Sequence, residues 1–204
     1  MHRCATDCCP SRPGALFARF LSLWATCLLA LTLWIGSLPA RAETPAPELS
    51  QFAVSRNEEG LLLDFAVRFD LPHSVEDALL KGVPLHFVAD ASLFRERWYW
   101  RDQRVNRVTR TWRLAYQPLT RTYRVSFGGL NQSFDSLADA VASVRRMGRW
   151  KLTEPGQIEE GEQYYVEFSY KLDTTLLPRP MQIGIGGQPD WTLQLEKTQR
   201  VTTP

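Results

Sequence analysis

The sequence has 204 residues, with 24 basic side chains, 22 acidic side chains and three histidines. All four cysteines lie within the first 27 residues, so a domain built from the rest of the chain holds no disulfide and no thiol nucleophile. Without the four arginines and one aspartate of the first 42 residues, 20 basic and 21 acidic side chains remain. This near-neutral balance gives no reason to expect binding to nucleic acid.

The first 42 residues have the features of a secretory signal peptide. Arginines precede an apolar run over residues 21–38, and Ala40-Arg41-Ala42 fits the small-x-small cleavage pattern. We therefore predict cleavage before Glu43 and a location in the periplasm or on the periplasmic face of the inner membrane. The apolar run approaches the length that spans a bilayer, so an uncleaved anchor is the alternative. Membrane contact is expected only through this segment.

A single domain is predicted over residues 49–196, after a proline-rich linker over residues 43–48. It begins with two segments, residues 49–56 and 61–69, that alternate between apolar and polar side chains. Such alternation is typical of half-buried antiparallel strands, and the turn between them contains a glycine.

A short helix is predicted next, over residues 75–81. Ser74 is expected to cap it and Gly82 to end it. Residues 84–93 then return to a strand. His86 alternates with apolar neighbours and has no spaced carboxylate partners, so we expect a packed or surface histidine rather than a metal ligand. No metal site and no cofactor are predicted.

Residues 95–127 gather nine arginines against two acids, although the domain as a whole is near neutral. Residues 107–116 and 122–127 alternate in polarity and are joined by a short connector that contains a proline, a pattern that predicts a β-hairpin. A helix from Asp102 is the alternative, because arginines recur there at every third residue. The strand is favoured because Thr, Val, Trp and Tyr dominate from residue 107 onward.

The two faces of this hairpin differ in character. Trp112 lies on the face expected to join the core, whereas Arg107, Arg113 and Arg124 share the opposite face. Arginine suits phosphate or carboxylate groups because its forked donors match their oxygens, so this face is the predicted binding surface. The alternative is that the acidic loop over residues 155–161 and the adjacent Glu162 fold over the arginines. Glu159, Glu160 and Glu162 would then neutralise them.

Trp98 and Trp100 precede the hairpin and would share one face of a strand. One interpretation is an aromatic plug in the core. The other is an aromatic binding platform next to the arginines.

Ser136 is expected to cap the clearest helix of the chain, over residues 137–147. Arg145 and Arg146 would lie in its last turn, where they complement the helix dipole, and Gly148 would end it. A short strand over residues 131–134 comes before this helix.

Three strands are predicted in the last part of the domain. Residues 164–173 alternate strongly, and residues 182–185 and 191–196 form two short final strands. Residues 197–204 are expected to be a C-terminal tail.

About eight strands and two short helices, connected mainly by hairpins, predict a mainly β protein. We expect an antiparallel β-sandwich or an open barrel, because the long crossover helices of a doubly wound fold are missing.

An ordered set of motifs extends over nearly the whole domain. Its members are Leu71-Pro72, Val75-Glu76-Asp77-Ala78-Leu79, Gly82-Val83-Pro84-Leu85, Arg97-Trp98-Tyr99-Trp100, Arg113-Leu114-Ala115-Tyr116, Leu119-Thr120-Arg121-Thr122-Tyr123-Arg124-Val125, Gly128-Gly129-Leu130, Gln132-Ser133-Phe134, Leu172-Asp173-Thr174 and Leu177-Pro178-Arg179-Pro180. In this order the chain resembles the proteobacterial exported proteins catalogued as domain of unknown function 4390. The resemblance implies an exported protein, transfers no catalytic residue, and suggests a link to a membrane sensor kinase.

The residues themselves favour a non-enzymatic binding or accessory module of the cell envelope. No serine lies in a nucleophile-elbow motif, and histidines are too few for a triad and a metal site together. The expected partner is an envelope protein or an anionic ligand. The alternative is an envelope enzyme that acts on a glycan or lipid through two paired carboxylates borne on strands.

Overall fold

The computed structural model describes residues 46–99, 101–159, 161–179 and 189–201. The predicted leader, Trp100 and the predicted strand over residues 182–185 lie outside the described residues. Thr44–Pro204 form one compact unit. Within its described part, nine strands form two antiparallel sheets, two α-helices accompany them, and neither sheet closes into a barrel. The predicted mainly β fold is confirmed.

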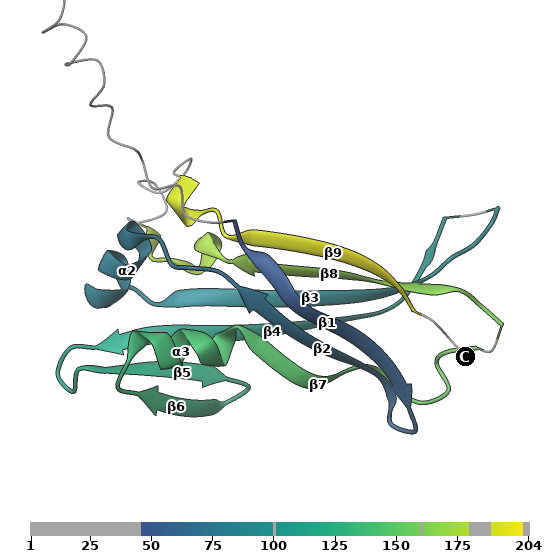
Figure 1. Ribbon diagram of the computed structural model, residues 1–204, viewed down its shortest axis with the longest axis horizontal. Helices are drawn as coiled ribbons and strands as arrows, with labels where there is room; N and C mark the ends of the chain where they lie inside the picture. Colours follow the sequence, from purple (N-terminus) through teal and green to yellow (C-terminus); the bar gives the residue numbers. More distant parts are fainter. Residues whose placement is uncertain (1–45, 100, 160, 180–188, 202–204) are drawn as a thin grey trace, which may run out of the picture. The chain divides into compact units, whose positions relative to one another are not determined.

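The larger sheet has six strands in the order β6-β5-β4-β3-β8-β9 and the smaller has three in the order β1-β2-β7. The strands of the larger sheet are β3 (Leu85–Arg95), β4 (Gln103–Gln117), β5 (Thr122–Phe127), β6 (Leu130–Phe134), β8 (Tyr164–Leu172) and β9 (Gln194–Val201). Those of the smaller sheet are β1 (Glu48–Asn57), β2 (Gly60–Arg68) and β7 (Arg146–Thr153). Figure 1 shows the smaller sheet crossing in front of the larger one.

The core lies between the two sheets, because alternate residues of each strand point to the same face. In β2, the residues that the alternation assigns to the core are buried: Leu61, Leu63, Phe65 and Val67. Phe65 reaches the larger sheet, where its ring centroid lies 4.8 Å from that of Phe168 and 6.1 Å from that of Tyr170. The helices α2 (His73–Leu80) and α3 (Leu137–Val144) add buried side chains to the same core.

The other face of the larger sheet is polar, and none of the described elements covers it. We call it the outer face. The same alternation that buries Phe87 and Ala89 turns His86, Val88 and Asp90 to this face. An antiparallel sheet tolerates one solvated face, so the fold leaves a broad polar surface for function.

The central hairpin is confirmed, and the alternative helix from Asp102 is wrong. β4 begins at Gln103 and pairs with β3 along its length, and β5 pairs with its second half. Trp112 is buried and stacks on Phe127 of β5, so the predicted division between an aromatic core face and an arginine face also holds.

Helix α3 is shorter than predicted. Ser136 caps it as expected, accepting a hydrogen bond from the backbone N–H of Asp139 at 3.1 Å. The helix ends at Val144, however, because the chain from Arg146 onward pairs with β2 as strand β7. Met147 lies opposite Phe65 in this pairing, so the apolar side chain that suggested another helical turn belongs to a strand. The predicted roles of Arg146 in the last turn and of Gly148 as the helix end are therefore wrong.

Two smaller boundaries also differ from the sequence-based expectation. Pro72, not Ser74, is at the N-cap of α2, and the Ser74 hydroxyl donates instead to Asp190 Oδ2 at 3.2 Å. Strand β9 continues to Val201, into the predicted tail, because its pairing with β8 extends to Tyr164.

Candidate functional site

Strand β4 places the predicted arginine face on the outer face of the larger sheet. Arg107 and Arg113 are exposed there, six residues apart, which corresponds to about 20 Å along a strand. Arg124 reaches the same face from β5. The three predicted arginines therefore share a face but do not converge on one point.

Arg107 has a partner that the sequence did not suggest. Its Nε donates to the two carboxylate oxygens of Asp90 at 2.8 and 3.1 Å, and the Thr109 hydroxyl donates to the same carboxylate at 2.8 Å. Asp90 lies on β3 directly opposite Thr109. The positive charge of Arg107 is thus offset within the sheet.

The predicted neutralising loop contacts a different arginine. Glu159 pairs with Arg95 at 2.9 Å, at the end of β3, and not with Arg107, Arg113 or Arg124. Glu160 lies outside the described residues. The expectation that this loop covers the arginine face is therefore not met by Glu159.

Arg113 and Arg124 form the centre of what we call the basic cluster, together with His86. Arg113 lies opposite Ser126 while Arg124 lies opposite Ala115, so the two arginines are diagonal neighbours, which lie about 7–8 Å apart and somewhat closer at Cβ. His86 of β3 lies directly opposite Arg113 on its other side. Among the described residues, neither arginine has a carboxylate within ion-pair distance.

Two nitrogen atoms of the basic cluster are buried without a partner. The Nε of Arg124 and the Nδ1 of His86 have no hydrogen bond to any described residue. Burial, and after it the neighbouring Arg113 cation, lower the pKa of His86, whereas Asp173 opposes this shift. Because the protein covers both atoms, an anion at this cluster would bind the other guanidinium nitrogens of the two arginines.

Asp173 marks one border of the basic cluster, but its carboxylate is already engaged. Its Oδ1 accepts hydrogen bonds from the backbone N–H of Thr175 at 3.0 Å and from the Thr175 hydroxyl at 2.7 Å. Burial alone would raise the pKa of Asp173, but these bonds outweigh it and hold the pKa below its usual range. The carboxylate therefore remains ionised and stays directed at Thr175.

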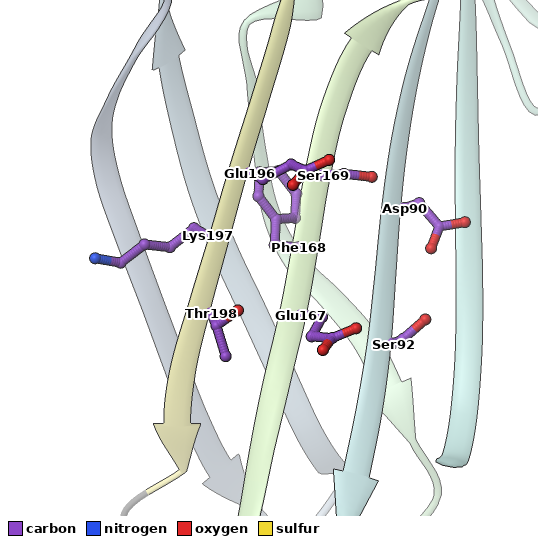
Figure 2. Close-up of a pocket in the computed structure, with 8 residues that line it drawn as sticks. All are labelled: Asp90, Ser92, Glu167, Phe168, Ser169, Glu196, Lys197 and Thr198. Atoms are coloured by element: carbon purple, nitrogen blue, oxygen red, sulfur yellow. The ribbon is translucent and has the colours of Figure 1, made fainter.

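The other half of the outer face is a shallow acidic hollow of about 300 Å³ over β3, β8 and β9. Its lining residues are Asp90, Ser92, Glu167, Phe168, Ser169, Glu196, Lys197 and Thr198. Figure 2 shows Asp90 turned toward β4 and Lys197 directed away from the carboxylates. Within the described ranges, no group of three or more potential ligand side chains is placed to hold a metal ion.

Trp98 is not a core plug, so the first of its two interpretations is wrong for this residue. It lies in the turn between β3 and β4 with 93% of its surface exposed. A ten-residue stretch of β4 separates that turn from Arg113, so Trp98 does not contribute to the basic cluster. Trp100 lies outside the described residues.

The fold and the site define a small antiparallel sandwich with one polar face, on which basic and acidic halves lie side by side. The chain matches the family model described as Domain of unknown function (DUF4390) over residues 44–201, and it belongs to this family. The resemblance to this family that the motifs indicated is thereby confirmed. No curated protein and no solved structure matches the chain. No helix of the described part is both long and apolar enough to cross a membrane.

Proposed function

We propose that this protein is an exported, non-enzymatic binding module of the cell envelope that captures an anionic group at the basic cluster. The observation that carries the proposal is the pair of neighbouring cations Arg113 and Arg124, neither of which has a counter-charge among the described residues. On the same face Arg107 already has Asp90. The sheet thus neutralises one of the three predicted arginines and leaves two for a ligand.

The chemistry of the basic cluster suits a compact anion with several oxygens. Each guanidinium offers two parallel N–H donors to a carboxylate, sulfate or phosphate, and two guanidinium groups on diagonal positions can bind the same anion from two sides. His86 adds a third donor when it is protonated. Such a group can belong to an acidic segment of an envelope protein or to a free ligand, and the family resemblance suggests a membrane sensor kinase as one such partner.

A second candidate function is an envelope enzyme that acts on a glycan or lipid through paired carboxylates. One observation favours it: Glu167 lies opposite Thr198 while Glu196 lies opposite Ser169, so the two acids are diagonal neighbours, about 7–8 Å apart and somewhat closer at Cβ. Inverting glycosidases place their carboxyl groups at about 6.5–9.5 Å. Hydrolysis of envelope glycans that disappears in Glu167→Gln would support this function over the binding module.

Sulfate is a suitable probe for the basic cluster, because its charge does not change near neutral pH. If the cluster binds it with a millimolar dissociation constant, about 50 mM sulfate should stabilise the fold by about 2 kcal/mol relative to chloride of equal ionic strength. This stabilisation is measured as a rise in melting temperature, which we call the sulfate increment. We expect the double variant Arg113→Gln/Arg124→Gln to lose the sulfate increment. The increment should grow only as the pH falls below 6.5, the ordinary pKa of histidine, because the lowered pKa of His86 keeps it neutral at pH 7 and its protonation adds a donor.

Arg107→Gln is the matched control, because it removes one cation from the same face but one that Asp90 already neutralises. It should keep the sulfate increment. Since sulfate also stabilises proteins without a site, the quantity compared is the difference between each variant and the wild type. Equal increments in all three proteins would remove the basic cluster from consideration.

If the protein is exported, cleavage of the signal peptide should produce a defined N-terminus. Because residues 21–38 and Ala40-Arg41-Ala42 form a signal peptide pattern, the protein isolated from the envelope should begin at Glu43. Mass analysis of its N-terminal peptide measures this. A product that begins at Met1 and fractionates with the membrane would support the anchor instead.

A further inference from the structure

The loop between β3 and β4 extends beyond the paired strands. The last pairs of β3 join Arg95 to Gln103 and to Tyr164, so the described residues between Arg95 and Gln103 have no strand neighbour. Figure 1 shows this loop at one end of the larger sheet and the β4–β5 turn at the other. The β4–β5 turn, at the other end of β4, can therefore serve as an internal control for this loop.

Two adjacent aromatic side chains are exposed at this loop. Trp98 is 93% exposed and Tyr99 is 72% exposed, and their rings meet edge to face with centroids 4.8 Å apart. Neither ring packs on the core, so core packing does not explain why these aromatic residues are present. An exposed apolar patch made of two adjacent aromatic rings is a candidate interaction site.

The loop is also cationic on its exposed side. Arg97, Arg101 and Arg104 are exposed, and among the described residues none of them pairs with a carboxylate side chain. The two acids of the loop are engaged by other groups. Glu96 accepts from Arg200 Nε at 3.0 Å, and Asp102 accepts from the Tyr165 hydroxyl at 2.9 Å.

Asp102 also holds the loop in shape. Besides the Tyr165 hydroxyl, it accepts a hydrogen bond from the backbone N–H of Arg97 at 3.1 Å. The Tyr165 ring stacks on Phe94 of β3 at 5.2 Å, so this contact fixes the base of the loop to the sheet. The base of the turn that carries the aromatic pair is therefore held to the sheet.

We infer that Trp98 and Tyr99 dock the protein on an anionic phospholipid surface, with Arg97 and Arg101 contacting the headgroups. Trp and Tyr prefer the headgroup level of a bilayer, because one end of each ring is apolar and the other polar. Arginines near a surface that carries anionic lipid are each worth about a fivefold gain in binding. This contact lies in the folded domain, whereas the sequence predicts membrane contact only through the N-terminal segment.

The size of the aromatic tip favours a lipid surface over a protein partner. Two aromatic side chains bury about 300–500 Å² in total, whereas a stable protein interface buries about 800 Å² on each partner. The same area is sufficient for shallow, reversible insertion between headgroups when cations assist it. A weak peripheral contact of this kind would bring the outer face close to the membrane without anchoring it.

Vesicle sedimentation tests this inference on the compact unit Thr44–Pro204, which contains every buried core residue of the described chain. We expect this unit to sediment with vesicles of phosphatidylcholine that contain about a third phosphatidylglycerol, and to do so more weakly with phosphatidylcholine alone. The variant Trp98→Ser/Tyr99→Ser should lower the partition coefficient on anionic vesicles roughly tenfold or more. Arg97→Gln/Arg101→Gln should remove the preference for anionic lipid.

The β4–β5 turn supplies matched controls. Leu119 is 100% exposed, and Arg121 is exposed beside it, so this turn also carries an apolar side chain and a cation. Leu119→Ser and Arg121→Gln should both sediment as the wild type does. Because all these side chains are exposed, each variant should keep the melting temperature of the wild type.

A second measurement reports the insertion of Trp98 through its fluorescence. Brominated acyl chains in the vesicles should quench part of the tryptophan emission of the wild type, and that part should be missing in Trp98→Phe. The inference is overturned if the wild type does not bind anionic vesicles. It is also overturned if Trp98→Ser/Tyr99→Ser binds them as well as the wild type does. Capture of a protein through Trp98 without lipid binding would likewise reassign the loop to a protein partner.

Discussion

Replacing Trp112 with alanine should lower the free energy of unfolding by about 3–5 kcal/mol. The indole is 4% exposed and stacks on Phe127 at 5.1 Å, while the ring of Phe65 from the smaller sheet meets it edge-on at 6.4 Å. Its removal would leave a cavity where the two sheets meet. Denaturant unfolding of the variant against the wild type measures the loss.

Arg113→Ala is the matched control for Trp112→Ala, because it changes the next residue on the opposite face of β4. Arg113 is exposed and lies on the outer face, so the expected change is within about 0.5 kcal/mol. Equal losses from the two substitutions would mean that the register of β4 is wrong. This comparison therefore tests the alternation on which the outer face depends.

Gly60→Ala should be destabilising by about 2–4 kcal/mol, the second largest effect that we expect. Gly60 begins β2 with φ of +112°, and a Cβ atom there would lie 2.1 Å from the carbonyl oxygen of Thr153. Because that oxygen belongs to the backbone of β7, relief requires the turn between β1 and β2 to move away from its neighbour. The loss is measured by denaturant unfolding.

Gly156→Ala separates the collision from the backbone strain. Gly156 also has a positive φ, of +88°, but a Cβ atom there would meet nothing within 4 Å. Its substitution should therefore cost only the strain of the left-handed conformation, about 1–2 kcal/mol. If both variants lose the same stability, close packing of the turn against β7 is not a constraint on this fold.

Local alternation predicted most of the sheet. In β8, the residues that alternate toward the core are all buried: Tyr164, Val166, Phe168, Tyr170 and Leu172. The period-two pattern is a direct consequence of strand geometry, so it can be read without knowledge of the neighbouring strands. Strand β7 was missed because Val144 and Met147 also fit a helical period, and only its pairing with β2 decides between the two.

The candidate site was predictable only in part. Alternation correctly placed Arg107, Arg113 and Arg124 on one face, but the partner of Arg107 depends on the register between β3 and β4, which brings Asp90 beside it. Composition also cannot distinguish a buried tryptophan from one exposed in a turn. The sequence therefore left Trp98 between the core and a binding platform, and the structure decides against the core because the chain leaves the sheet just before this residue.

The side-chain NMR signals of the arginine Nε–H groups test the basic cluster most directly, because they report each guanidinium separately. On titration with sulfate at constant ionic strength, the signals of Arg113 and Arg124 should shift together with one dissociation constant, and the signal of Arg107 should stay in place because Asp90 already holds its Nε. Variants with Gln at each position assign the three signals. A shift of Arg107 alone, or of none of the three, would contradict the proposal that the outer face binds anions at the basic cluster.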